Sequence, residues 1–216
     1  AASGDAWVRV ASNVGEHVFA ESLTFRLDAG CDAPAEDVVL RYTVQGAAIV
    51  NRRIPTFSPG ARVSARHTED LVRGQIAPAS VVTWWWTLTD ADGRTFETPR
   101  ESLRYLDARF DWRSLESRGV RVWWYDRDRP FAEGIAEDAG SALERVERLV
   151  GAPRETSVEL VAYQSQDDLR PALVARGSTY EARLATLGAR VAPDILVFDA
   201  GTRPQDLAEV IAHELS

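Results

Sequence analysis

A histidine followed directly by a glutamate, His213 and Glu214, is the residue pair in this sequence best suited to chemistry. When a second histidine lies four residues after the first on a helix, the two imidazoles can bind zinc, and the glutamate lies beside the metal-bound water. Here Leu215 and Ser216 follow, and the sequence ends before the position of that second histidine. Taken alone, the pair also suits a partly exposed helix end whose histidine has a structural partner.

The pair falls in a segment that is predicted to be helical from Thr202 to Ser216. Thr202 and Gln205 have the spacing of a capping box, which satisfies free amide groups at a helix start. At helical spacing, Glu214 projects from the middle of an apolar stripe formed by Leu207, Val210, Ile211 and Leu215. An unpaired carboxylate against a core is unfavourable, so Glu214 requires either a cleft or a partner.

Length and composition indicate a globular chain of two domains. The 216 residues are 45% apolar, and the net charge of -8 argues against binding to nucleic acid or anionic membranes. No apolar run reaches the ~20 residues that cross a bilayer. The single cysteine, Cys31, excludes an internal disulfide and a cysteine-cluster metal site.

The first residues indicate that either a signal peptide has been removed or the chain is a fragment cut from a longer protein. The chain contains no methionine, so Ala1 is not a translation start, and the small residues at positions 1–6 suit the exit of a cleaved secretory signal. We therefore expect an extracytoplasmic location, secreted or in the cell envelope, for a fragment of a longer parent. A membrane anchor outside this sequence and the oligomeric state are left open.

Residues 1–108 are predicted to form an antiparallel β-sandwich that resembles a fibronectin type III or immunoglobulin-like domain. Short runs of alternating apolar and polar residues, such as 23–27 and 38–44, are separated by turn residues. In the longest predicted strand, Trp84 and Trp86 should enter the core while Trp85 faces the other way. Residues 109–117 are predicted to be a linker in which Phe110 and Trp112 dock the two halves together.

Residues 118–216 change to helical periodicity and predict an α/β domain. A strand at 119–125 precedes a helix that Asp128 and Pro130 open and Gly151 ends. Further strands are expected at 156–163, 189–191 and 195–198, and the last of them leads into the histidine-glutamate helix. No glycine-rich phosphate loop is present, so the pattern does not predict a nucleotide site.

Four stretches carry a resemblance to bacterial peptidase MA-like extracytoplasmic proteins, which are thermolysin-like zinc metallopeptidases of the gluzincin group preceded by a β-sandwich. They are Arg109–Trp112, Val120–Tyr125, Tyr163–Leu169 and Ile211–Ser216. The α/β domain thus resembles the N-terminal half of a gluzincin catalytic domain, cut within its HExxH helix.

The resemblance implies a site and a reaction. His213 would be a zinc ligand and Glu214 the catalytic base of peptide-bond hydrolysis by metal-activated water, with the other ligands beyond Ser216. The substrate backbone would lie along an edge strand, here Ala189, Arg190 and Val191, which equally suits a plain edge strand. A peptide or protein is the expected partner. One imidazole cannot complete the site, so we expect no zinc and no activity in these 216 residues alone.

Two other hypotheses remain. In the first, the peptidase machinery has decayed and the protein is an extracellular binding module. In the second, the β-sandwich binds carbohydrate through Trp85. Both predict a parent protein without metal, and a histidine at position 217 would favour the peptidase over either.

Overall fold

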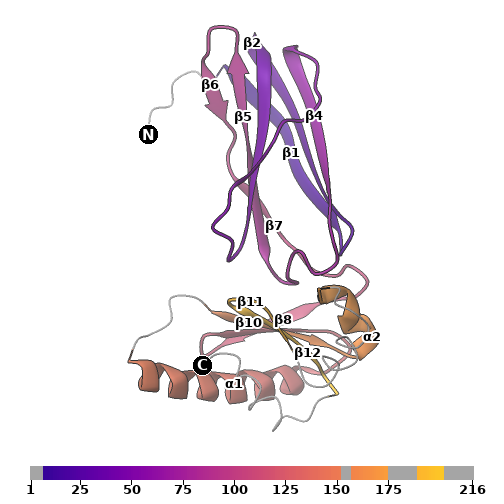
Figure 1. Cartoon of the computed structure of the whole chain (residues 1–216), viewed down its shortest axis with the longest axis vertical. Helices are drawn as coiled ribbons and strands as arrows, with labels where there is room; N and C mark the ends of the chain where they lie inside the picture. The colour runs from indigo at the N-terminus through magenta and orange to yellow at the C-terminus, as the bar shows by residue number, and fades with distance from the viewer. Residues whose placement is uncertain (1–6, 152–156, 175–188, 202–216) are drawn as a thin grey trace. The chain divides into compact units, whose positions relative to one another are not determined.

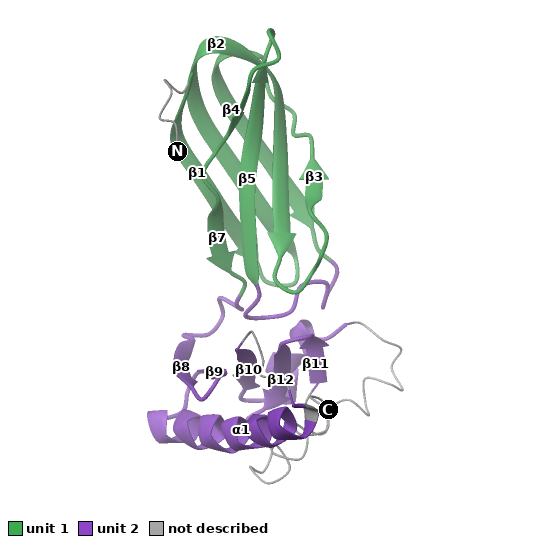
Figure 2. Cartoon of the chain, turned by 90° about the vertical axis from the view of Figure 1, so that its left-hand side faces the viewer, with its two compact units in different colours: residues 1–71, 81–105 green, residues 72–80, 106–216 purple. Residues whose placement is uncertain are grey.

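The computed structural model describes residues 7–151, 157–174 and 189–201. The chain divides into two units, which Figure 2 colours separately: unit 1 comprises Ala1–Leu71 and Val81–Tyr105, and unit 2 comprises Val72–Ser80 and Leu106–Ser216. The predicted helix over 202–216, with its site residues, lies outside the described residues. Within the described part, no helix is long and apolar enough to span a membrane.

Unit 1 is a curled antiparallel sheet, as expected for a β-sandwich. Its strands are β1 (Val8–Val18), β2 (Ser22–Val44), β3 (Asn51–Arg53), β4 (Gly60–Asp70), β5 (Val81–Asp90), β6 (Thr95–Glu97) and β7 (Glu101–Arg104). The long strand β2 pairs with β1 and β4 through its first half, and with β3 and β5 through its second half. A single strand therefore belongs to both layers of the sheet (Figure 1).

The core of unit 1 joins these two layers. Phe25, from the first half of β2, stacks on Tyr42 from the second half with ring centres 5.3 Å apart. Trp84 and Trp86 are buried, as predicted, and both indole N–H groups donate to Asn13 Oδ1, at 2.8 and 3.0 Å. A single amide oxygen on β1 thus satisfies two buried donors on β5.

A half-buried charged cluster also links the layers. Arg53 on β3 donates two hydrogen bonds to the carboxylate of Glu69 on β4, at 2.6 and 2.7 Å, and His67 lies 3.1 Å from the same carboxylate. The Arg53 guanidinium also lies over the ring of Tyr42. The hydrogen bonds from Arg53 lower the pKa of Glu69 from 4.5 to about 2, although burial opposes this shift.

Unit 1 is expected to lose stability as the pH falls from about 5 to about 2. The pKa of Glu69 is about 2 in the folded protein and 4.5 in the unfolded chain. The stability that the Glu69 carboxylate contributes is therefore fully present above pH 4.5 and is lost as the pH falls through about 2. The loss should be about 2 kcal/mol, the scale of a charged hydrogen bond. Urea unfolding of wild type and Glu69→Gln between pH 6 and pH 2.5 checks this: a variant with the same pH slope as wild type contradicts the assignment.

Unit 2 is built on a mixed five-stranded sheet. Its elements are β8 (Arg113–Ser117), β9 (Val120–Trp124), α1 (Arg129–Val150), β10 (Val158–Tyr163), α2 (Gln166–Leu169), a 3-10 turn η1 (Arg170–Ala172), β11 (Ala189–Ala192) and β12 (Ile195–Asp199). The strand order is β11-β12-β10-β9-β8. The three central strands are parallel, and the outer strands β8 and β11 are antiparallel to their neighbours.

Two predicted boundaries need correction. Residues 113–117, predicted as linker, form β8, which turns into β9 through Arg118 and Gly119, both with positive φ. Residues 72–80, predicted in the first domain, belong to unit 2. Gly74 lies so close to the backbone there that a Cβ would be 2.3 Å from Val174 N.

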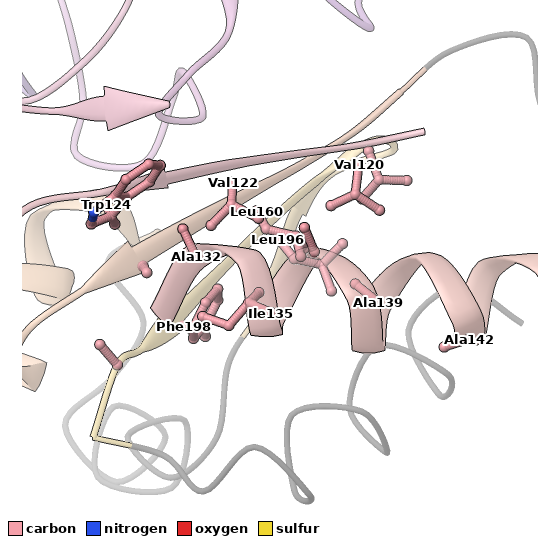
Figure 3. Close-up of a cluster of buried hydrophobic side chains, with 14 of the residues drawn as sticks. Val120, Val122, Trp124, Ala132, Ile135, Ala139, Ala142, Leu160, Leu196 and Phe198 are labelled. Atoms are coloured by element: carbon pink, nitrogen blue, oxygen red, sulfur yellow. The ribbon is translucent and has the colours of Figure 1, made fainter. Parts of the chain in front are cut away.

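Helix α1 covers one face of this sheet, as its sequence pattern predicts. The side chain of Asp128 accepts from Phe131 N–H at its start, and Gly151 ends it in the left-handed region. Its small apolar residues pack against alternate positions of β9, β10 and β12 (Figure 3). They are Ala132, Ile135, Ala136, Ala139, Ala142 and Leu143, against Val120, Val122, Trp124, Val158, Leu160, Ala162, Leu196 and Phe198.

Candidate functional site

The carboxyl ends of the three parallel strands of unit 2 lie together at one edge of the sheet. β9 ends at Trp124, β10 at Tyr163 and β12 at Asp199. Ala200 N–H donates to Tyr163 O at 2.6 Å, which holds the chain after β12 against the end of β10. Residues 202–216, including His213 and Glu214, follow directly in the sequence. In open α/β sheets this edge commonly carries the functional site.

The proposed substrate strand is an edge strand. Ala189 lies opposite Val197 and Arg190 opposite Leu196, and the register shift before Ala192 leaves Val191 without an opposite residue. The Arg190 guanidinium donates to Pro193 O at 3.1 and 2.7 Å. Among the described strands β11 pairs only with β12, which makes it an edge strand of the described sheet.

The segment before β8 contains an ion pair between a buried carboxylate and a half-exposed guanidinium. The Asp107 carboxylate, 1% exposed, accepts three hydrogen bonds from the Arg109 guanidinium at 2.6 to 3.0 Å. The backbone carbonyl of Asp107 accepts from the Trp112 indole N–H at 2.8 Å. Asp107 could not be identified from the sequence, because a lone aspartate at a strand end has no distinguishing spacing.

Phe110 and Trp112 pack inside unit 2. The Phe110 ring stacks on Tyr125 at 4.1 Å between centres, and Trp112 meets Tyr125 and Tyr163 edge to face at 4.9 and 5.2 Å. These are the two rings that were predicted to dock the halves of the chain together. The contacts described for them lie within unit 2 and fix residues 107–112 to the ends of β9 and β10.

The Tyr125 hydroxyl connects this aromatic cluster to the turn after β10. It donates to Asp168 Oδ2 at 2.9 Å and accepts from Gln164 N–H at 2.9 Å. Burial raises the pKa of Tyr125, and the carboxylate of Asp168 raises it further. The hydroxyl therefore remains a neutral donor at physiological pH. Ser165 caps α2 by accepting from Asp168 N–H.

Tyr125→Phe is expected to destabilise unit 2 by about 1–3 kcal/mol, because Gln164 N–H and Asp168 lose a buried partner. Phe keeps the stack on Phe110, so the change isolates the hydroxyl. Amide hydrogen exchange at residues 164–169 should rise together with the loss in unfolding free energy. Unchanged exchange there would show that the hydroxyl does not hold the turn.

The described residues contain no group of three or more histidine, cysteine, aspartate or glutamate side chains that could hold a metal ion. Glu159 on β10 is a buried carboxylate, but it already accepts from the Trp123 indole N–H at 2.5 Å and lies 3.7 Å from Arg121. The carboxylates Asp107, Glu159 and Asp168 each accept a hydrogen bond from a described side chain.

Comparisons with known proteins do not assign the chain to a family. No protein-family model and no curated protein matches the sequence. A carbohydrate-binding module of family 56, a β-1,3-glucan-binding domain, is 18% identical, with a TM-score of 0.28 over 43% of this chain and 96% of its own. A family 64 β-1,3-glucanase from Paenibacillus barengoltzii is 16% identical, with a TM-score of 0.28 over 44% of this chain and 21% of its own.

A third solved structure, purple acid phosphatase PPD1 from yellow lupin, is 10% identical, with a TM-score of 0.30 over 73% of this chain and 29% of its own. All three likenesses are too weak to carry a conclusion about function.

Proposed function

We propose that this chain is part of a secreted or cell-envelope zinc metallopeptidase and that unit 2 is the N-terminal half of its catalytic domain. One observation supports the proposal most: the antiparallel edge strand β11 lies beside β12, and β12 leads into the segment with His213 and Glu214. The candidate peptide-binding edge strand is thus the neighbour of the strand that the candidate metal-binding segment follows in the sequence. The gluzincin assignment, and the immunoglobulin-like assignment of unit 1, are part of this proposal.

The residues present do not form a complete zinc site. A catalytic zinc takes three protein ligands, and His213 supplies one of them. The proposal therefore requires a second histidine at the position after Ser216 and a third ligand further on. When bound, zinc would polarise the peptide carbonyl and acidify its bound water.

The chain's own residues have two roles in this proposal. The β11 backbone would bind an extended peptide through main-chain hydrogen bonds, and the bond from Arg190 to Pro193 would keep the strand's turn rigid. Glu214 would hold a proton during the reaction and pass it to the leaving amine.

Zinc content tests the proposal. The protein extended past Ser216 is expected to bind about one zinc per chain and to cleave peptides, whereas the 216-residue chain should hold no stoichiometric zinc after dialysis against a weak chelator. An extended protein without zinc would contradict the peptidase and favour a binding module with a decayed site. Tightly held zinc in the 216-residue chain would show that our ligand assignment is wrong.

Carbohydrate binding by unit 1 is the second candidate. The solved structures named above include carbohydrate-binding and glucanase proteins, but the Trp85 ring is not an open platform in this chain. It is 7% exposed, and the Arg100 guanidinium lies 4.4 Å from its centre. Sugar stacking on Trp85 would require Arg100 to move. Any carbohydrate site on this face must therefore use the groups around the ring.

A further inference from the structure

The second half of β2 forms one layer of unit 1 with β3 and β5, and the outward face of this layer carries arginines on neighbouring strands. Arg52 of β3 lies opposite Arg41 of β2, and Arg41 lies opposite Trp85 of β5. The guanidinium of Arg100, a residue just before β7, lies over the Trp85 ring, 4.4 Å from its centre. We call Arg41, Arg52 and Arg100 the arginine row. At about 5 Å per strand spacing, the row extends for about 14 Å across the sheet.

The arginine row lacks negative partners in the described part of the chain. Arg41 donates to a neutral group, the Thr87 hydroxyl. The side chains of Arg52 and Arg100 form no hydrogen bond or ion pair with any described residue. The carboxylate of Glu97, opposite Thr87, accepts from the Thr87 hydroxyl at 3.4 Å. Three guanidinium groups are therefore available to an external anion.

Placing Arg41 opposite Arg52 costs stability, because like charges on directly paired residues repel. Elsewhere in unit 1 a similar pair is compensated: Arg26 lies opposite Arg66, but Glu16 forms a salt bridge with Arg26 at 3.1 Å. No described carboxylate forms a salt bridge with Arg52. In a chain with a net charge of -8, three neighbouring arginines without a salt bridge to any described carboxylate favour binding of an anion there.

Hydroxyl groups flank the arginine row on the same face. Two residues further along the strands, Thr43 lies opposite Thr83, and Thr83 lies opposite Ser102. Guanidinium groups bind carboxylates through paired hydrogen bonds, and hydroxyl side chains donate to and accept from neutral hydroxyls. The face therefore matches a ligand that carries carboxylates and many hydroxyls along an extended chain.

We propose that the arginine row binds an acidic polysaccharide, with sugar carboxylates on Arg41, Arg52 and Arg100 and sugar hydroxyls on the threonine and serine side chains beside them. Single-stranded nucleic acid fits less well, because it needs an open aromatic ring for base stacking, and Trp85 is only 7% exposed. This proposal rests on the carbohydrate-binding candidate, gives it a ligand class, and is independent of the peptidase.

Calorimetric titration of the 216-residue chain with oligogalacturonate tests the proposal. We expect binding that weakens with added salt and falls about tenfold or more in Arg52→Ser and in Arg100→Ser. Arg26→Ser removes the same charge from the other layer, where Glu16 is the partner, and should bind as wild type. Arg52→Ser should also keep or raise the melting temperature, since it removes the repulsion with Arg41.

Three outcomes would overturn the proposal. Unchanged affinity in the Arg52→Ser/Arg100→Ser double variant would place the ligand elsewhere. Equal weakening by Arg26→Ser, or equally tight binding of single-stranded DNA, would show general attraction of polyanions. Binding of a neutral β-1,3-glucan, unaffected by the double variant, would support carbohydrate binding but reject the acidic site. None of these results depends on zinc or on peptide hydrolysis.

Discussion

Glu214→Gln, introduced into the protein extended past Ser216, is expected to lower peptide hydrolysis by about 10²- to 10⁴-fold. Glutamine has nearly the shape of glutamate but cannot accept the proton of the attacking water. Zinc content should stay at the wild-type level, because His213 and not Glu214 is the proposed ligand. The measurement is the initial rate of peptide cleavage at equal zinc per chain.

Glu209→Gln is the matched control for this variant. Glu209 lies five residues earlier in the same predicted helix, and at 100° per residue its side chain is on another face. The control should retain the wild-type rate. If Glu214→Gln cleaves as fast as wild type at equal zinc, Glu214 is not the base. If the variant loses zinc as well as activity, Glu214 is a ligand instead.

Asn13→Leu is expected to lower the unfolding free energy of unit 1 by about 2–5 kcal/mol. The Asn13 side-chain oxygen accepts from both Trp84 and Trp86, so its loss leaves two buried indole N–H groups without a partner. Each unsatisfied buried donor costs about 1–3 kcal/mol. Denaturant unfolding followed by tryptophan fluorescence measures the change.

Asn13→Asp tests whether the stability of unit 1 depends on the acceptor oxygen of Asn13. Aspartate keeps an oxygen at the same position, and both tryptophans can still donate to it. We expect most of the stability lost in Asn13→Leu to remain in this variant, apart from the cost of placing a charge there. Equal losses in the two variants would show that the shape of the amide, and not its oxygen, is what unit 1 requires.

Periodicity in the sequence predicted the elements whose signals are local. Alternation along β2 and β5 identified buried strand faces, and Asp128, Pro130 and Gly151 marked the limits of helix α1. These signals work because a strand repeats every two residues and a helix every 3.6, and because cap residues act within one turn. The change in period likewise distinguished an antiparallel first half from an α/β second half.

Two features were missed for different reasons. β8 has mostly exposed residues and so lacks a clear apolar alternation, although its partner β9 follows directly through the turn at Arg118 and Gly119. Residues 72–80 belong to unit 2, where Gly74 meets the backbone near Val174, about a hundred residues later in the sequence. This second relation has no signal within a short window.

The candidate sites divide in the same way. The residues His213 and Glu214 were identified by the sequence alone, because a metal-binding helix has a fixed short spacing, and the chemistry of the pair follows from residue type. Only the tertiary structure showed that β11 is the antiparallel neighbour of β12, that Arg100 covers Trp85, and that Asn13 serves two tryptophans on another strand. Sheet register and side-chain contacts bring together residues that are far apart in the chain. The spacing of these residues in the sequence does not indicate which of them will be in contact.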